Sequence, residues 1–230
     1  MCGRFGQFSP AETLAAEFNL VTPPKYGPRY NIAPNQPALV VRTARQTGGR
    51  ELAWMQWGLV PSWAKDPNIG ARMINARIET AAEKPAFRAA FQRRHSLVPA
   101  DVFYEWDRKK GGKKNQPYAF KLISGRPMAL AGLWEYWETV DGALETFTIL
   151  TTSANRLIET IHDRMPVIVP PDVYDAWLSA EADLVLPARV AEPFPAEQME
   201  RIMIDTYVND VRHEGPECLS PPVERQMSLL

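Results

Sequence analysis

The chain has 230 residues, and its hydrophobic fraction of 45% and charged fraction of 23% are those of an ordinary globular protein with a sizeable core. A formal net charge of -1 and a pI near 6.3 exclude a polycation, so any contact with nucleic acid must depend on a local basic cluster. Two cysteines and three histidines are too few for a zinc finger or a disulfide framework, and no apolar run approaches the roughly 18–20 residues that span a membrane. We therefore expect a cytoplasmic protein without a metal, a cofactor or a membrane partner.

The first third of the chain predicts one helix and a hairpin. Ser9 and Glu12 are spaced as a capping box for a short helix that begins near Pro10. Residues 29–34 are polar and bounded by proline, which predicts a shaped loop. The runs Ala38–Arg42 and Glu51–Trp57 read as two strands joined by a glycine-containing turn.

The remainder predicts mostly strands. Met73–Thr80 reads as an extended segment, Lys84–His95 as a helix, and Leu97–Trp106 as two strands interrupted at Pro99. Short helices are expected before His162 and over Asp172–Ser179, and the tail from about residue 218 reads as polar. Further strands are expected at Tyr118–Leu122, Met128–Trp137, Glu145–Thr152, Val167–Val169 and Met199–Ile204. We find no linker and expect a single domain over residues 1–230.

The N-terminal residues carry the most distinctive chemistry. Because the side chain of Cys2 is small, Met1 is expected to be trimmed, which leaves an α-amine and a thiol on one residue. The amine has a pKa of about 8 and the thiol a pKa of about 8.5, so both are partly reactive at neutral pH. The amine can condense with an aldehyde to an imine, and the thiol can then close a five-membered thiazolidine. This reading requires an exposed terminus; the alternative is that Cys2 is a buried small residue.

Polar side chains elsewhere suggest a site. Asn75, Arg77 and Glu79 alternate along one segment and would share a face if it is extended, although a solvated strand face has the same pattern. Glu105 lies among aromatic residues, where desolvation would raise its pKa, unless it lies on the wet face of a strand. His162 is expected at a helix C-terminus, where the helix dipole favours its charged form; the alternative is a histidine that only caps the helix.

Two other features could contact nucleic acid. Trp63 follows a proline-serine turn and, if exposed, is a platform on which a base can stack; burial is the alternative. Residues 108–114 contain a basic loop that is either a solvated tip or a contact for phosphates.

Together these segments resemble a known family. The strings, in chain order, are MCGRF, RYNIAP, WGLVPSWA, NARIET, YEW and HDRMP. They are similar to the signature blocks of the SRAP family, the abasic-site processing proteins also called SOS-response-associated peptidases. The resemblance runs from residue 2 to about 217. It departs from the family at Val102, where a glycine is usual, and at Ser96, where a cysteine is expected.

The resemblance implies a fold, an activity and a set of residues. The fold is a mixed α+β domain with a strongly bent, barrel-like antiparallel β core flanked by short helices. The activity is a lyase-like Schiff-base reaction in which Cys2 forms a thiazolidine cross-link with an abasic site in single-stranded DNA. The implied catalytic residues are Cys2, Asn75, Glu105 and His162. The implied DNA-binding residues are Arg4, Asn31, Trp63, Arg77 and Arg164. No metal or cofactor is implied, and a monomer that associates with the nucleoid is the simplest expectation.

Two other classes of protein remain open. N-terminal-nucleophile glutamine amidotransferases also begin with methionine, cysteine and glycine, but their thiol attacks an amide with the α-amine as base. They usually continue with isoleucine where this chain has Arg4. The second alternative is a single-stranded DNA-binding module that uses Trp63 and arginines without forming a covalent bond.

Overall fold

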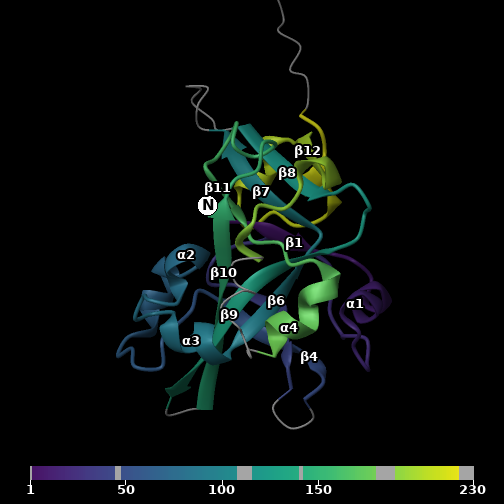
Figure 1. Ribbon diagram of the computed structural model, residues 1–230. Helices are drawn as coiled ribbons and strands as arrows, with labels where there is room; N and C mark the ends of the chain where they lie inside the picture. Colours follow the sequence, from purple (N-terminus) through teal and green to yellow (C-terminus); the bar gives the residue numbers. More distant parts are fainter. Residues whose placement is uncertain (1, 45–47, 108–115, 140–141, 180–189, 223–230) are drawn as a thin grey trace, which may run out of the picture.

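Two β-sheets form the centre of the molecule, and short helices lie around them (Figure 1). This computed structural model describes residues 2–44, 48–107, 116–139, 142–179 and 190–222. Within those ranges, no helix combines the length and the apolar character needed to cross a membrane.

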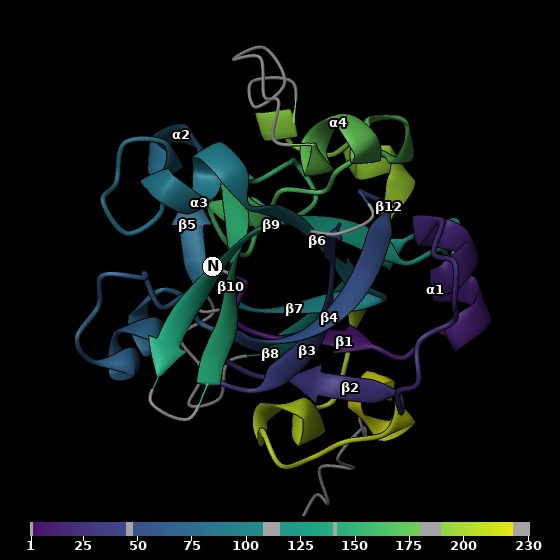
Figure 2. The ribbon, with the colours of Figure 1, turned by 90° about the horizontal axis from the view of Figure 1, so that it is seen from below.

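The larger sheet contains a closed barrel. Its five strands are β3 (Pro37–Thr43), β4 (Arg50–Trp57), β6 (His95–Ala100), β9 (Met128–Thr139) and β10 (Gly142–Ser153). Strand β3 pairs with β4 and β6, β6 pairs with β9, β9 pairs with β10, and β10 pairs with β4, so the ring has no open edge (Figure 2). Two short strands, β5 (Asn75–Arg77) and β11 (Arg164–Pro166), extend the sheet by pairing with the end of β10.

The second sheet is antiparallel and carries the N-terminal strand in its interior. In spatial order its strands are β12 (Met199–Met203), β8 (Gln116–Leu122), β7 (Val102–Asp107), β1 (Phe5–Gln7) and β2 (Arg29–Ile32). Only Asp101 separates β6 from β7, so the chain passes directly from the barrel into this sheet. Strand β1 therefore holds the first residues of the chain next to β7.

The helices are short and peripheral. The α-helices are α1 (Ala11–Phe18), α2 (Ile78–Ala81), α3 (Arg88–Arg93) and α4 (Tyr174–Leu178). The 3-10 helices are η1 (Pro67–Arg72), η2 (Pro171–Val173), η3 (Ala196–Gln198), η4 (Thr206–Asn209) and η5 (Pro216–Leu219). Helix α1 lies on one side of the barrel and helices α2 and α3 lie on the opposite side (Figures 1 and 2).

The expected α+β fold with a barrel-like core is confirmed, and so is the hairpin now formed by β3 and β4. The antiparallel description needs one correction, because β10 runs parallel to β4 and to β5. The basic loop at residues 108–114 lies outside the described residues.

Several local predictions are wrong for identifiable reasons. Helix α1 has no side-chain cap, because the hydroxyl and the amide of Ser9 both bond the carboxylate of Asp101. The predicted loop at residues 29–34 contains β2, which pairs with β1. The extended segment predicted from Met73 ends at Arg77 and α2 begins at Ile78, so Glu79 leaves the shared face.

Other boundaries also move. The predicted helix Lys84–His95 is reduced to α3, and His95 begins β6. Pro99 pairs with Ala129 inside β6, so the break between the strands is at Asp101. The residues before His162 form turns instead of an α-helix.

The first two residues of the WGLVPSWA segment, Trp57 and Gly58, show how the core positions the residues that follow them. Trp57 is fully buried and packs edge to face on Phe5 with ring centroids 5.0 Å apart. Its Nε1 donates to the carbonyl oxygen of Ile74 at 2.8 Å, immediately before Asn75. Gly58 has φ 123°, and a Cβ there would lie 2.6 Å from the carbonyl oxygen of Gly70. Only glycine allows this close approach, which packs η1 against the barrel and fixes the start of β5.

Candidate active site around the N-terminal cysteine

The catalytic candidates come from four different parts of the chain. Cys2 precedes β1, Asn75 begins β5, Glu105 lies in β7, and His162 lies just before β11. Strands β5 and β11 both pair with the end of β10, and β1 pairs with β7, so the two sheets bring these segments together.

Cys2 is bound directly to Asn75. The side-chain Nδ2 of Asn75 donates to the carbonyl oxygen of Cys2 at 2.7 Å. Oδ1 of Asn75 is buried, and none of the described groups donates a hydrogen bond to it. The Sγ of Cys2 lies 3.9 Å from the carbonyl oxygen of Arg4. This geometry leaves one polar atom of Asn75 free to accept a hydrogen bond from a ligand.

Cys2 is fully buried, so the expectation of an exposed residue is wrong for the chain that still carries Met1. The alternative reading, a buried small residue, is correct as a description of its packing, yet the residue lies beside the polar groups expected around it. Burial and then the negative charge of Glu105 raise the pKa of the Cys2 thiol to about 12. The thiol is therefore protonated at neutral pH and is a poor first nucleophile.

Glu105 is almost fully buried, at 4% exposure, and burial raises its pKa above the usual range of glutamate. The nearby charge of His162 works in the opposite direction. The expected direction of the shift is confirmed. A carboxyl group with a raised pKa can hold or accept a proton closer to neutral pH, which suits a general acid or base.

His162 is held in one ring orientation. Its Nδ1 accepts a hydrogen bond from the backbone amide of Arg164 at 2.9 Å. Nδ1 also lies 2.9 Å from the Oδ1 of Asp163. The amide of Arg164 can only donate, so Nδ1 must be unprotonated to accept that bond and cannot at the same time donate to Asp163. The neutral ring therefore carries its proton on Nε2, because Nδ1 is occupied.

Arg164 and Arg77 flank this site on β11 and β5. The guanidinium of Arg164 forms a two-point ion pair with Glu79, at 2.7 and 2.8 Å, and donates to the carbonyl oxygen of Thr151 at 2.5 Å. Its side chain is only 12% exposed. Hydrogen bonding from Arg164 lowers the pKa of Glu79. Arg77 pairs in register with the same Thr151 and is exposed.

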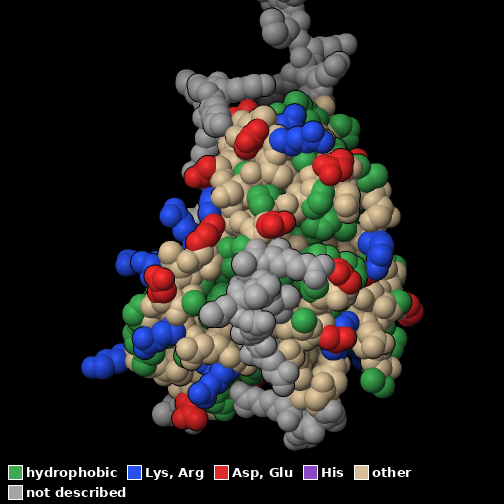
Figure 3. Space-filling model, viewed as in Figure 1, with side chains coloured by type: hydrophobic (Ala, Val, Ile, Leu, Met, Phe, Trp, Pro, Cys, Tyr) green, Lys and Arg blue, Asp and Glu red, His purple; other side chains and the backbone are tan. Residues whose placement is uncertain are grey.

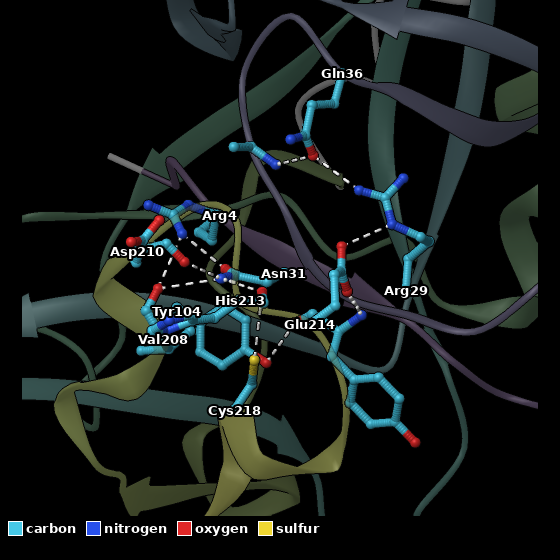
Figure 4. A network of polar contacts seen from close by, with 12 residues as sticks. Arg4, Arg29, Asn31, Gln36, Tyr104, Val208, Asp210, His213, Glu214 and Cys218 are labelled. Atoms are coloured by element: carbon cyan, nitrogen blue, oxygen red, sulfur yellow. Dashed lines mark hydrogen bonds and ion pairs between the residues drawn. The ribbon is translucent and has the colours of Figure 1, made fainter.

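Arg4 and Asn31 form a second group beside the site (Figure 4). Nη1 of Arg4 donates to Oδ1 of Asn31 at 2.7 Å and to the carbonyl oxygen of Val208 at 3.0 Å. Asn31 is fully buried, and its Nδ2 faces three carbonyl oxygens of the C-terminal segment. Its amide is hydrogen-bonded within the protein, and its side chain has no exposed surface in this structure.

Trp63 lies on the surface, with 60% of its area exposed, whereas Trp57 of the same segment is in the core. Its Nε1 lies 3.4 Å from the carbonyl oxygen of Pro85, between α2 and α3. Figure 3 shows lysine and arginine side chains along this flank of the molecule. Its exposed basic residues include Arg72, Arg77, Lys84, Arg88 and Arg93. Exposed basic side chains are therefore present on this flank despite the net charge of -1, next to the exposed acidic residues Asp66, Glu79 and Glu83.

The structure thus joins Cys2, Asn75, Glu105 and His162, and it places Arg4 next to them. No sequence pattern indicated that residues 205–213 contact Arg4 and Asn31, and the polar tail predicted after them includes the buried Cys218. The pairing of Glu79 with Arg164 was not predicted either. Within the described ranges, no group of three or more His, Cys, Asp or Glu side chains is arranged to hold a metal ion.

The protein is thus a barrel domain in which the cysteine at position 2 lies beside an amide, a carboxyl group and an imidazole. The chain belongs to the family described as SOS response associated peptidase (SRAP), which it matches over residues 1–211. The resemblance seen in the sequence is confirmed.

Relatives cover nearly the whole chain. Abasic site processing protein YoqW of Bacillus subtilis is 40% identical over 224 residues, which cover 95% of this chain and 99% of YoqW. Abasic site processing protein YedK of Escherichia coli is 30% identical, with 96% of this chain and 100% of YedK covered. A solved structure from Bacteroides thetaiotaomicron has the same fold, with a TM-score of 0.83 at 22% identity over 96% of this chain and all of that chain.

Proposed function

We propose that the protein recognises abasic sites in single-stranded DNA and captures them covalently through Cys2 after removal of Met1. The observation that carries the proposal is the contact between Asn75 and the carbonyl of Cys2, next to the buried carboxyl group of Glu105. The names of the relatives, abasic site processing proteins, support the same substrate.

The first step is opening of the sugar. An abasic deoxyribose is mostly a cyclic hemiacetal, and attack requires the open aldehyde. A base removes the proton of the C1′ hydroxyl while an acid delivers a proton to the ring oxygen. Glu105 and His162 are the two groups available for this exchange. Oδ1 of Asn75, which is buried and unused, would accept a hydrogen bond from a sugar hydroxyl.

The amine reacts before the thiol. Because the thiol pKa is about 12, the thiol is protonated, whereas an α-amine with a pKa of about 8 is partly neutral at pH 7. The Cys2 nitrogen adds to C1′, and loss of one water gives an imine. The thiol then adds to the imine carbon: sulfur bonds to C1′, Glu105 accepts the thiol proton, and the former imine nitrogen takes up a proton. The product is a thiazolidine, and one water is released overall.

The remaining residues hold the DNA. Trp63 would stack on a base, and Arg77 would bind a flanking phosphate. The guanidinium of Arg164 is paired with Glu79, so Arg164 would bind a phosphate only if the phosphate displaced Glu79. Arg4 would bind DNA from a place fixed by Asn31. We expect the protein to act as a monomer.

A denaturing gel with abasic DNA tests the proposal. Wild type should give a heat-stable cross-link, and undamaged DNA of the same sequence should give none. Cys2→Ala keeps an α-amine, so it should lose the durable adduct and retain an imine that borohydride traps. Undiminished hydrolysis-resistant cross-linking in Cys2→Ala would refute the thiazolidine step. Dissociation of the wild-type complex on the gel would instead favour a non-covalent binder, and release of ammonia from glutamine would favour an amidotransferase.

A further inference from the structure

The C-terminal segment, residues 205–220, is held together by hydrogen bonds and ring contacts within itself. Its two ends are joined by a hydrogen bond from the amide of Asp205 to the carbonyl oxygen of Ser220 at 2.8 Å. Inside it, the rings of Tyr207 and His213 stack with centroids 3.9 Å apart. Cys218 is fully buried. The segment therefore has a defined shape that can hold other residues in place.

The segment holds the chain beside Cys2. The carbonyl oxygen of Val208 accepts from the guanidinium of Arg4 at 3.0 Å, and Asn31 forms hydrogen bonds with both residues (Figure 4). Nδ2 of Asn31 lies 3.2, 2.9 and 2.9 Å from the carbonyl oxygens of Val208, Asp210 and His213. Because Arg4 is two residues from Cys2, these contacts fix the start of β1.

The same segment also holds the residue beside Glu105. Nε1 of Trp106 donates to Oδ1 of Asn209 at 2.7 Å. The guanidinium of Arg4 lies over the Trp106 ring, 5.5 Å from its centroid. Two consecutive residues of η4 therefore make these contacts. Val208 binds Arg4, which is two residues from Cys2, and Asn209 binds Trp106, which follows Glu105.

The outer edge of the segment is tied to β2. Glu214 forms an ion pair with Arg29 at 2.7 Å and accepts from the backbone amide of Tyr30 at 2.7 Å. The hydroxyl of Tyr104 also donates to the carbonyl oxygen of Tyr30, at 2.7 Å. These contacts prevent the segment from sliding along the sheet.

We propose that residues 205–220 are a positioning element that sets Cys2 and Glu105 against each other, with Asn209 as the positioning residue on the Glu105 side and Asn31 on the Cys2 side. The inference rests on the proposed function, since Cys2 and Glu105 are its reacting groups. Small errors in the placement of reacting groups cost large factors in rate, so a contact outside the site can control the chemistry.

Asn209 gives the sharpest test, because it is exposed and its replacement leaves the core intact. Asn209→Ala removes the acceptor for Trp106, whereas Asn209→Asp keeps an oxygen at the same place. Val211→Ala is the matched control: its side chain is 43% exposed and lies in the same segment. Two quantities are measured for each variant: the maximum rate of cross-linking at saturating abasic DNA, and the pKa of Glu105 from NMR titration of its labelled carboxyl carbon.

Asn209→Ala should lower the maximum rate by about threefold to tenfold while the DNA concentration at half-maximal rate stays the same. It should also raise the Glu105 pKa further, because a loosened Trp106 weakens the backbone hydrogen bond that lowers this pKa. Asn209→Asp and Val211→Ala should resemble wild type in both quantities. An unchanged Glu105 titration in Asn209→Ala, or an equal effect in Val211→Ala, would overturn the proposal. If wild-type protein formed no cross-link, the proposed function would fail, and the Glu105 titration would still decide the positioning role.

Discussion

The side-chain amide of Asn75 donates a hydrogen bond of 2.7 Å to the main-chain carbonyl of Cys2, 73 residues away in the sequence. Asn75 begins β5, which pairs with β10 of the barrel, so the amide is attached to the barrel sheet. The contact therefore orients the second residue of the chain from the barrel wall and leaves one amide oxygen for a ligand.

Replacing Asn75 tests this relationship. Asn75→Ala should slow cross-linking about tenfold or more, because Cys2 loses its anchor and the sugar loses a partner. The rate is measured in single turnover at saturating abasic DNA. Asn68→Ala, at an exposed position of η1, is the control and should react as wild type does. Equal rates for the Asn75 and Asn68 variants would contradict the assigned role.

The raised pKa of Glu105 should make the free energy of unfolding depend on pH. The folded state raises the pKa of Glu105 above the value of about 4.3 expected for the unfolded chain. As the pH rises above that value, the unfolded chain releases the proton while the folded protein keeps it. The contribution of Glu105 to stability is therefore full below the unfolded pKa and falls until the pH reaches the folded pKa.

Glu105→Gln removes this titration. The stability of the variant relative to wild type should therefore increase between pH 4 and pH 8, as measured by urea unfolding at both pH values. Cross-linking by the variant should be slower, since glutamine cannot transfer a proton. A stability difference that does not vary with pH would show that the carboxyl group is not perturbed by burial.

Replacement of Trp63 should change the affinity for DNA without changing the maximum rate of cross-linking. Stacking of one base on an aromatic side chain contributes about 1–3 kcal/mol, so Trp63→Ala should weaken DNA binding by about tenfold. Binding is measured with a reduced abasic analogue that lacks the aldehyde, and the maximum cross-linking rate should not change. Trp54→Ala is the control, because Trp54 is also exposed, at 49%, but belongs to β4. Equal losses in the two variants would remove Trp63 from the interface.

A side chain at position 58 should destabilise the folded protein. Its φ of 123° and the approach of 2.6 Å to the carbonyl oxygen of Gly70 leave no room for a side chain. Gly58→Ala should lower the free energy of unfolding by about 3 kcal/mol. Gly27→Ala is the control, since no atom lies within 4 Å of a Cβ at that position. Similar unfolding midpoints for the two variants would show that the Gly58–Gly70 contact is not restrictive.

The sequence predicted those parts of the fold that have a local pattern. Strand-like runs separated by turn signals located the long barrel strands such as β9 and β10, and the aromatic neighbours of Glu105 indicated its desolvation. The N-terminal cysteine was recognisable from its chemistry alone. Its exposure was left open between two alternatives, because burial depends on how β1 is enclosed by β2 and β7.

The rest could not be predicted because it depends on distant contacts. Asn31 bonds carbonyl groups 177, 179 and 182 residues away, and no local pattern marks such partners. Strand β2 is only four residues long and forms by pairing with β1. Ser9 resembles a helix cap in sequence, but in the folded chain it is hydrogen-bonded to Asp101 instead. The polar composition of the C-terminal segment gave no sign of the buried Cys218.

Intact-mass analysis of the protein after incubation with an abasic oligonucleotide tests the central claim most directly. The account predicts a protein that lacks Met1 and a single adduct equal to protein plus oligonucleotide minus one water, stable to heating. A processed protein that stays at its unmodified mass, or an adduct that forms equally well while Met1 is still attached, would contradict capture by the amine and thiol of Cys2.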